Sequence, residues 1–158
     1  MALRRIAVVS ALGWALLAPA RLAAQQPATP ETAVNEFMRA VRDSNLTRMM
    51  QLWGNEKGSA ARTKQPPDYQ KRVYIMYAYL KGANHRIAML QPDTSEGRSR
   101  AMLVEFTRDE CQKQAMVNTK KSKQDGWLVN AIDLAAIGVP GRPCTGETVE
   151  TPDSAARN

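Results

Sequence analysis

The sequence contains one histidine and two cysteines among its 158 residues, and this scarcity limits the chemistry that it can perform. A structural zinc site needs four ligands, mostly from Cys and His. His85, Cys111 and Cys144 are too few for such a site, so we predict no metal and no cofactor. No motif of a catalytic nucleophile accompanies the single histidine.

Apolar runs long enough to cross a bilayer are also missing. The uncharged run 6–20 has about 15 residues, whereas a membrane-spanning helix needs about 20. This run follows Arg4 and Arg5 and leads into small residues that end at Ala24, which is the order of a secretory signal peptide. We therefore predict a cleavable signal peptide over residues 1–24, export to the periplasm or the extracellular space, and no stable membrane anchor.

The positive charge of the chain comes partly from this segment. Cleavage removes three arginines and no acid, so the net charge falls from +7 to about +4. A moderate charge of this kind does not single out nucleic acid, and we predict no nucleic-acid partner. The basic cluster 120–123 is interpreted as a solvated hairpin; contact with an anionic partner or lipid headgroups is the alternative.

An even number of cysteines in an exported chain favours a disulfide. We predict a Cys111–Cys144 bond, which would close a loop of about 34 residues and stabilise the fold by about 3–4 kcal/mol. Two unpaired buried thiols are the alternative.

Three amphipathic helices are predicted after the linker 25–28. The first begins at Thr29-Pro30-Glu31, with Thr as the N-cap and Pro in the first turn. The second covers 46–53 and the third 69–80, each with apolar residues at helical spacing. Residues 55–67 between them are predicted to be a loop.

From His85 onward the apolar period changes from 3.6 to 2, which predicts strands. We expect four of them, over 86–90, 101–107, 111–121 and 127–133. Their short connections, including the Asp125-Gly126 turn signal, predict an antiparallel meander. The domain is predicted to span 29–146, with an irregular loop at 135–146 and a disordered tail at 147–158.

Three helices followed by a curved meander resemble the nuclear-transport-factor-2-like superfamily, which has a cystatin-like α+β fold. The features that carry the resemblance are the opening of the first helix at 29–37, the second helix at 46–53, and the Gly-Trp-Leu-Val opening of the last strand at 126–129. The resemblance covers residues 29–134. It implies a cone-shaped cavity between the helices and the sheet. In some relatives, such as ketosteroid isomerase and the polyketide cyclases, this cavity is an active site.

Several side chains are candidates for the wall of such a cavity, because they lie on apolar stripes and combine area with polar tips or polarisable groups. These candidates are Trp53, Tyr69, Tyr77, Met102 and Phe106. Ordinary core packing is the alternative for each of them. We assign no catalytic residue: His85 is expected at the surface or at a helix cap, Glu105 is expected to face solvent, and Asp133 is expected to be a strand-edge residue.

We expect a non-enzymatic, exported domain that binds a small apolar ligand or a protein partner. Two alternatives remain. One is a cavity enzyme of isomerase or cyclase type, with His85 or a carboxyl group as its base. The other is a structural accessory protein with a filled cavity.

Overall fold

The computed structural model describes residues 26–92 and 97–140 of the chain. The predicted signal peptide with its cleavage site after Ala24, the residue Cys144 and the predicted tail lie outside the described residues. The Cys111–Cys144 bond therefore stays a prediction. Within the described residues no cysteine is free.

The three long helices form where the sequence predicts them, and two are capped by side chains. Helix α1 spans Pro30–Arg42, and its N-cap Thr29 accepts a hydrogen bond from the Thr32 amide at 3.1 Å. Helix α2 spans Leu46–Leu52 and is capped by Asn45. Helix α4 spans Tyr69–Leu80. Each cap satisfies a backbone N–H that has no partner inside its helix.

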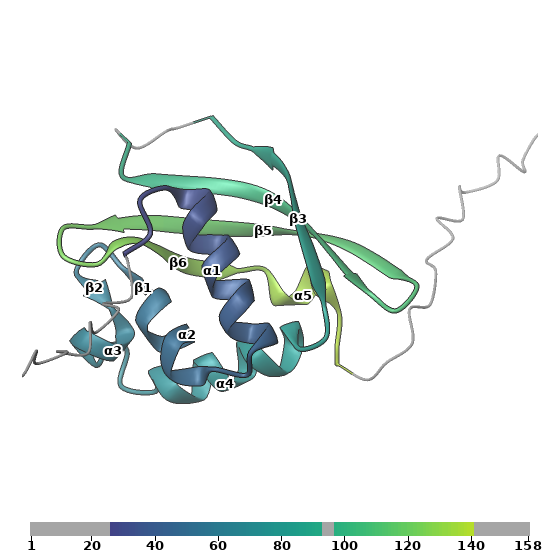
Figure 1. Cartoon of the computed structure of the whole chain (residues 1–158), viewed down its shortest axis with the longest axis horizontal. Helices are drawn as coiled ribbons and strands as arrows, with labels where there is room; N and C mark the ends of the chain where they lie inside the picture. Colours follow the sequence, from purple (N-terminus) through teal and green to yellow (C-terminus); the bar gives the residue numbers. More distant parts are fainter. Residues whose placement is uncertain (1–25, 93–96, 141–158) are drawn as a thin grey trace, which may run out of the picture.

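The strands form one antiparallel sheet in the order β3-β4-β5-β6. They span Asn84–Leu90, Ser99–Arg108, Cys111–Ser122 and Gly126–Ile132. Figure 1 shows α1, α2 and α4 on one side of this sheet. The class predicted from the sequence is thereby confirmed in its main features, a mixed α+β domain with a four-stranded antiparallel sheet and helices.

The predicted loop at 55–67 is not irregular throughout. It contains the two-residue strands β1 (Gly54–Asn55) and β2 (Gly58–Ser59) and the one-turn helix α3 (Ala60–Thr63). Elements this short carry no periodic apolar pattern. Contacts with the distant β5–β6 turn, described below, hold them in place.

The predicted loop at 135–146 also begins with structure, the one-turn helix α5 (Leu134–Ile137). Its N-cap is Asp133, whose Oδ1 accepts a hydrogen bond from the Ala136 amide at 3.2 Å. The expectation that Asp133 is a strand-edge residue was therefore incomplete, because the side chain caps a helix that the sequence analysis missed.

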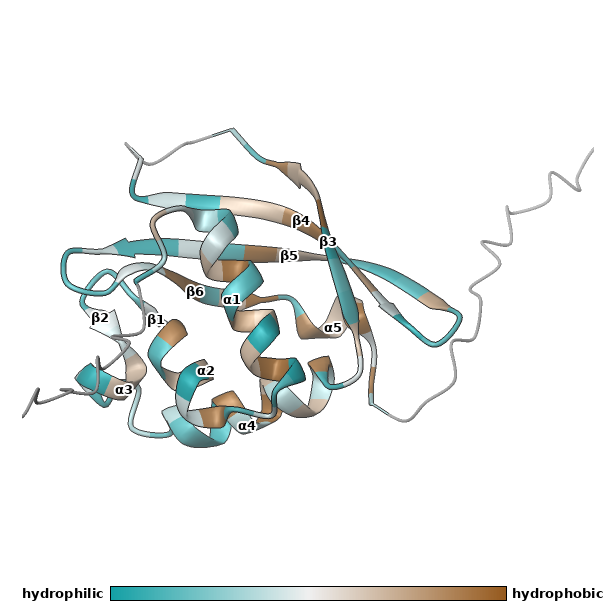
Figure 2. Cartoon of the chain, viewed as in Figure 1, coloured by the Kyte–Doolittle hydropathy of each residue, from teal (hydrophilic) through white to brown (hydrophobic). Residues whose placement is uncertain are grey.

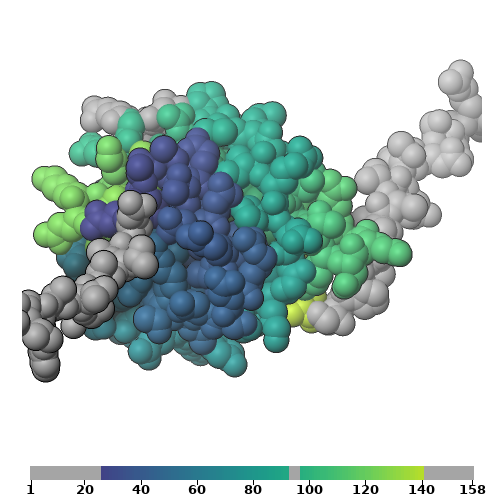
Figure 3. Space-filling view, in the orientation of Figure 1, coloured from purple at the N-terminus to yellow at the C-terminus, as the bar shows by residue number. Residues whose placement is uncertain are grey.

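The hydrophobic core lies between the helices and one face of the sheet. Figure 2 shows hydrophobic residues in β4 and β5 and in the helices α2 and α4, and in Figure 3 the atoms of α1 and α2 cover the middle of this side of the molecule. The largest side chains that are less than 2% exposed are contributed by both layers: Phe37, Met38, Met49, Leu52, Leu80, Met102 and Leu128.

Strand β6 contains an irregularity that the period-2 pattern did not predict. Thr119 of β5 pairs with Val129, but Asn118 pairs with Ala131, so Asn130 is an extra residue in β6. A bulge of this kind reverses the alternation of side chains beyond it. Ala131, predicted to face inward with Trp127 and Val129, is exposed instead.

Candidate functional site

Four of the five predicted pocket residues meet in one apolar cluster. Met102 and Phe106 on β4 are 0% and 2% exposed, and half-buried Trp53 and Tyr77 pack against the same cluster. Tyr69 is buried at the start of α4 but is not a member of this cluster; Lys64 lies over its ring, 5.7 Å from the centroid. Side chains from α2, α4 and β4 thus come together between helices and sheet.

The polar tips of the aromatic candidates are engaged inside the protein. The Trp53 indole N–H donates to the Asn130 carbonyl oxygen at 2.9 Å. The Tyr77 hydroxyl forms a hydrogen bond with the Ser44 hydroxyl at 2.8 Å, and a longer contact of 3.4 Å joins Gln70 to the Tyr69 hydroxyl. The single donor of the Trp53 indole is therefore used, and each tyrosine hydroxyl already has one protein partner.

The position of Trp53 is set by the bulge in β6. Asn130 accepts the indole hydrogen bond with its carbonyl and donates from its side-chain Nδ2 to the Gly54 carbonyl at 2.8 Å. Trp53 also forms a parallel bridge with Val129. The sequence contains no signal for this role of Asn130, because a polar residue at an outward position is ordinary in a half-buried strand.

His85 lies on β3, where its Nε2 is 2.8 Å from Oδ1 of Asn35 on α1. The side chain is half-buried rather than at the surface, and its partner is an amide rather than a helix end. Burial, with a smaller contribution from Arg42, lowers the pKa of the imidazole below its ordinary value of 6.5. The structure therefore favours a neutral histidine that joins α1 to the sheet.

Glu105 is on the face of β4 opposite the core, as predicted, but the expectation that it faces solvent was wrong. Its side chain is only 10% exposed and forms a two-point ion pair with Arg86 on β3, with N–O distances of 3.0 and 3.1 Å. Hydrogen bonding by Gln112 and the Arg86 guanidinium hold the pKa of this carboxyl below its ordinary value. The register places Glu105 directly opposite Arg86, so the pair is a cross-strand contact that the separate strand patterns did not reveal.

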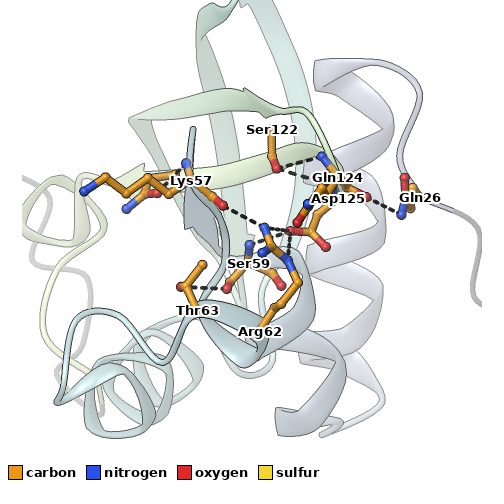
Figure 4. A network of polar contacts seen from close by, with 9 residues as sticks. Gln26, Lys57, Ser59, Arg62, Thr63, Ser122, Gln124 and Asp125 are labelled. Carbon is orange, nitrogen blue, oxygen red and sulfur yellow. Dashed lines mark hydrogen bonds and ion pairs between the residues drawn. The ribbon is translucent and has the colours of Figure 1, made fainter.

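A polar network joins the β5–β6 turn to the short elements β2 and α3 (Figure 4). The Asp125 carboxylate accepts hydrogen bonds from the Ser59 amide at 2.9 Å and from Arg62 Nε at 3.0 Å. Arg62 also donates to the Lys57 carbonyl at 2.6 Å. Both bonds go to one carboxylate oxygen, Oδ2, and the network holds segment 54–63 in place.

The same turn holds the start of the described chain. The Trp127 amide donates to the Pro27 carbonyl at 3.0 Å, and Gln26 donates to the Gln124 carbonyl. Gly126 has a φ of +67°, and a Cβ there would lie 2.6 Å from the Pro27 oxygen. Only glycine fits both the turn conformation and this close approach.

Within residues 26–92 and 97–140, no group of three His, Cys, Asp or Glu side chains is placed to hold a metal ion. No helix in that part of the chain is long and apolar enough to span a membrane.

The fold and the site define a class of protein: an α+β domain whose helices cover one face of an antiparallel meander and enclose an apolar cluster. The structure is similar to a crystal structure of an NTF2-like protein of unknown function from Cytophaga hutchinsonii, at 12% sequence identity and a TM-score of 0.39. The match covers 66% of this chain and 90% of that one. No protein-family model and no curated protein matches the chain.

Proposed function

We propose that the chain is an exported, non-catalytic domain of nuclear-transport-factor-2-like type that binds a small apolar molecule. The ligand contacts the half-buried rings of Trp53 and Tyr77, behind which Met102 and Phe106 form the apolar wall. The observation that carries this proposal is the engagement of the ring tips: Trp53 donates to Asn130, and Tyr77 is bonded to Ser44.

The engagement of Trp53 supports an apolar class of ligand. Its indole has a single donor, which Asn130 already accepts, so the ring offers its apolar surface, and a polar ligand would have to break that hydrogen bond without a gain. Aromatic and sulfur-containing side chains favour hydrocarbon and aromatic surfaces. The ligand is therefore apolar rather than a polar metabolite.

A dye titration tests the proposal. A neutral fluorescent naphthylamine dye is titrated into the mature protein and into Trp53→Leu and Tyr77→Leu, with Ile75→Ala as the control on the same helix. Ile75 is 41% exposed and does not belong to the apolar cluster, whereas Tyr74 is unsuitable because its ring lies 6.4 Å from that of Tyr77. We expect saturable binding that both test substitutions weaken severalfold and the control leaves unchanged. Absence of saturable binding, or equal weakening by Ile75→Ala, would contradict the proposal.

Native mass spectrometry of protein purified from its own host supplies a second readout. A retained apolar molecule that is lost from Trp53→Leu would identify the ligand directly. Retention of a polar, charged metabolite instead would overturn the assignment of ligand class.

A further inference from the structure

The outer side of α4 has a stripe of exposed residues that the fold leaves uncovered. Lys71, Tyr74, Ala78 and Lys81 follow one another at helical spacings of three and four, Ile75 lies beside Tyr74 at spacings of four and three from Lys71 and Ala78, and all five are exposed. Tyr74 is 62% and Ile75 41% exposed. We call these five residues the outer stripe; it is about 15 Å long at 1.5 Å per residue and has a lysine at each end of an apolar centre.

The charges around the outer stripe are predominantly positive. Segment 64–82 contains four basic residues and a single acid, Asp68. That acid is already paired with Arg72, at N–O distances of 2.9 and 3.0 Å. The two terminal lysines of the stripe have no carboxylate partner among the described residues, and Lys81 lies over the Tyr77 ring at 5.9 Å. The stripe is thus complementary to an anionic surface.

We propose that the outer stripe of α4 docks the domain reversibly on an anionic lipid bilayer, with Tyr74 and Ile75 in the interfacial region and Lys71 and Lys81 among the headgroups. Tyrosine suits this region, because its ring is apolar and its hydroxyl stays hydrated. Lysine side chains extend their apolar stems toward the surface and keep the ammonium groups at headgroup level. The arrangement is that of an interfacial helix held by both apolar burial and charge.

The shape of the stripe favours a bilayer over a protein partner. An amphipathic helix docks on a protein when that protein offers a groove for its apolar residues. Here the apolar centre is short, convex and flanked by cations. A deformable, negatively charged bilayer surface can therefore contact the three apolar side chains and both lysines at the same time. The stripe adjoins the proposed ligand contact, because Tyr74 and Lys81 both approach the Tyr77 ring; the two proposals are separated by their readouts, dye binding for the ligand and vesicle binding for the stripe.

Vesicle sedimentation of the mature protein tests the docking. Vesicles of phosphatidylcholine alone are compared with vesicles that also contain phosphatidylglycerol, at low and high salt. Lys71→Gln/Lys81→Gln is compared with Lys121→Gln/Lys123→Gln, a pair of equal charge change in the basic cluster 120–123, which is the rival contact for lipid headgroups; a greater loss in this second pair would assign the binding to the β5–β6 turn and overturn the proposal. We expect binding to the anionic vesicles that decreases with salt and that weakens roughly fivefold per lysine removed from the stripe, with little change in the control.

The apolar centre is tested separately. Tyr74→Ser/Ile75→Ser should weaken the binding that persists at high salt, whereas Met89→Ser/Leu90→Ser, which alters equally exposed apolar residues on β3, should not. Circular dichroism confirms that each variant is folded. Failure of the mature protein to bind anionic vesicles, or equal loss in test and control pairs, overturns the proposal. Binding to soluble polyglutamate without binding to vesicles would assign the stripe to an acidic protein and would also overturn it.

Discussion

The burial of Phe106 predicts a large loss of stability for a single substitution. The ring is 2% exposed and belongs to the apolar cluster. Replacing Phe106 with Ala removes the transfer free energy of the ring and leaves a cavity that neighbouring side chains only partly fill, so we expect a loss of about 3–5 kcal/mol. That is a large part of the 5–15 kcal/mol by which a domain of this size is typically stable.

Urea unfolding followed by tryptophan fluorescence measures this loss. With a slope of about 2 kcal/mol per M for a domain of this size, the midpoint should fall by about 2 M. Tyr74→Ala is the matched control, since its ring is 62% exposed and its removal should change stability by no more than about 0.5 kcal/mol. Phe106→Leu should fall between the two, at less than about 1.5 kcal/mol. If Phe106→Ala cost no more than Tyr74→Ala, the core described above would be wrong.

Four further predictions concern other parts of the molecule. Asp125→Ala should lower the free energy of unfolding by about 2 kcal/mol, because the buried Ser59 amide and the Arg62 Nε lose the carboxylate that accepts their hydrogen bonds. An unchanged urea midpoint would mean that the network does not stabilise the fold. Burial lowers the pKa of His85, so the unfolded chain binds a proton that the folded chain does not as the pH falls below about 6.5. The free energy of unfolding should therefore decrease as the pH is lowered through this window, and this pH dependence should be absent in His85→Gln. The same pH dependence in both proteins would refute the assignment. Thiol labelling of the unfolded, unreduced protein should find Cys111 and Cys144 paired, and replacing both with Ser should cost about 3–4 kcal/mol; two labelled thiols would exclude the bond. Protein recovered from outside the cytoplasm should have the mass expected for cleavage after Ala24, and full-length protein in the membrane fraction would contradict export.

Elements with a strong local signal could be predicted from the sequence. The first helix combines an N-cap threonine, a proline in its first turn and a stripe of large apolar residues, and α1 begins at Pro30 with Thr29 as its cap. The tight turn at Asp125-Gly126 needs a positive φ, which glycine supplies, and it joins β5 to β6 at that place. Local conformation and tertiary packing favour the same structure at these positions.

What could not be predicted depends on contacts between residues far apart in the chain. Segment 54–63 has no periodic pattern, and its order depends on Asp125, which lies more than 60 positions later. The cross-strand pairing of Arg86 with Glu105 became visible only once the register was known. For the candidate site, the apolar stripes identified which rings face the sheet, but not that Ser44 and Asn130 occupy their polar tips.

Helix α4 shows that the functional role of a residue can also depend on which face of its helix the fold covers. A helix with apolar residues on all sides is normally buried on all sides, and the sequence of α4 has large apolar residues at nearly every position from Val73 to Leu80. The buried stripe predicted for this helix includes neither Tyr74 nor Ile75. The structure buries Val73, Met76 and Leu80 and exposes those two, so the apolar character of the helix exceeds what its own fold can cover. Because exposed Tyr and Ile side chains in this position add nothing to the core, and because lysines bracket them, the excess is most simply explained by a surface outside the protein that is both apolar and anionic.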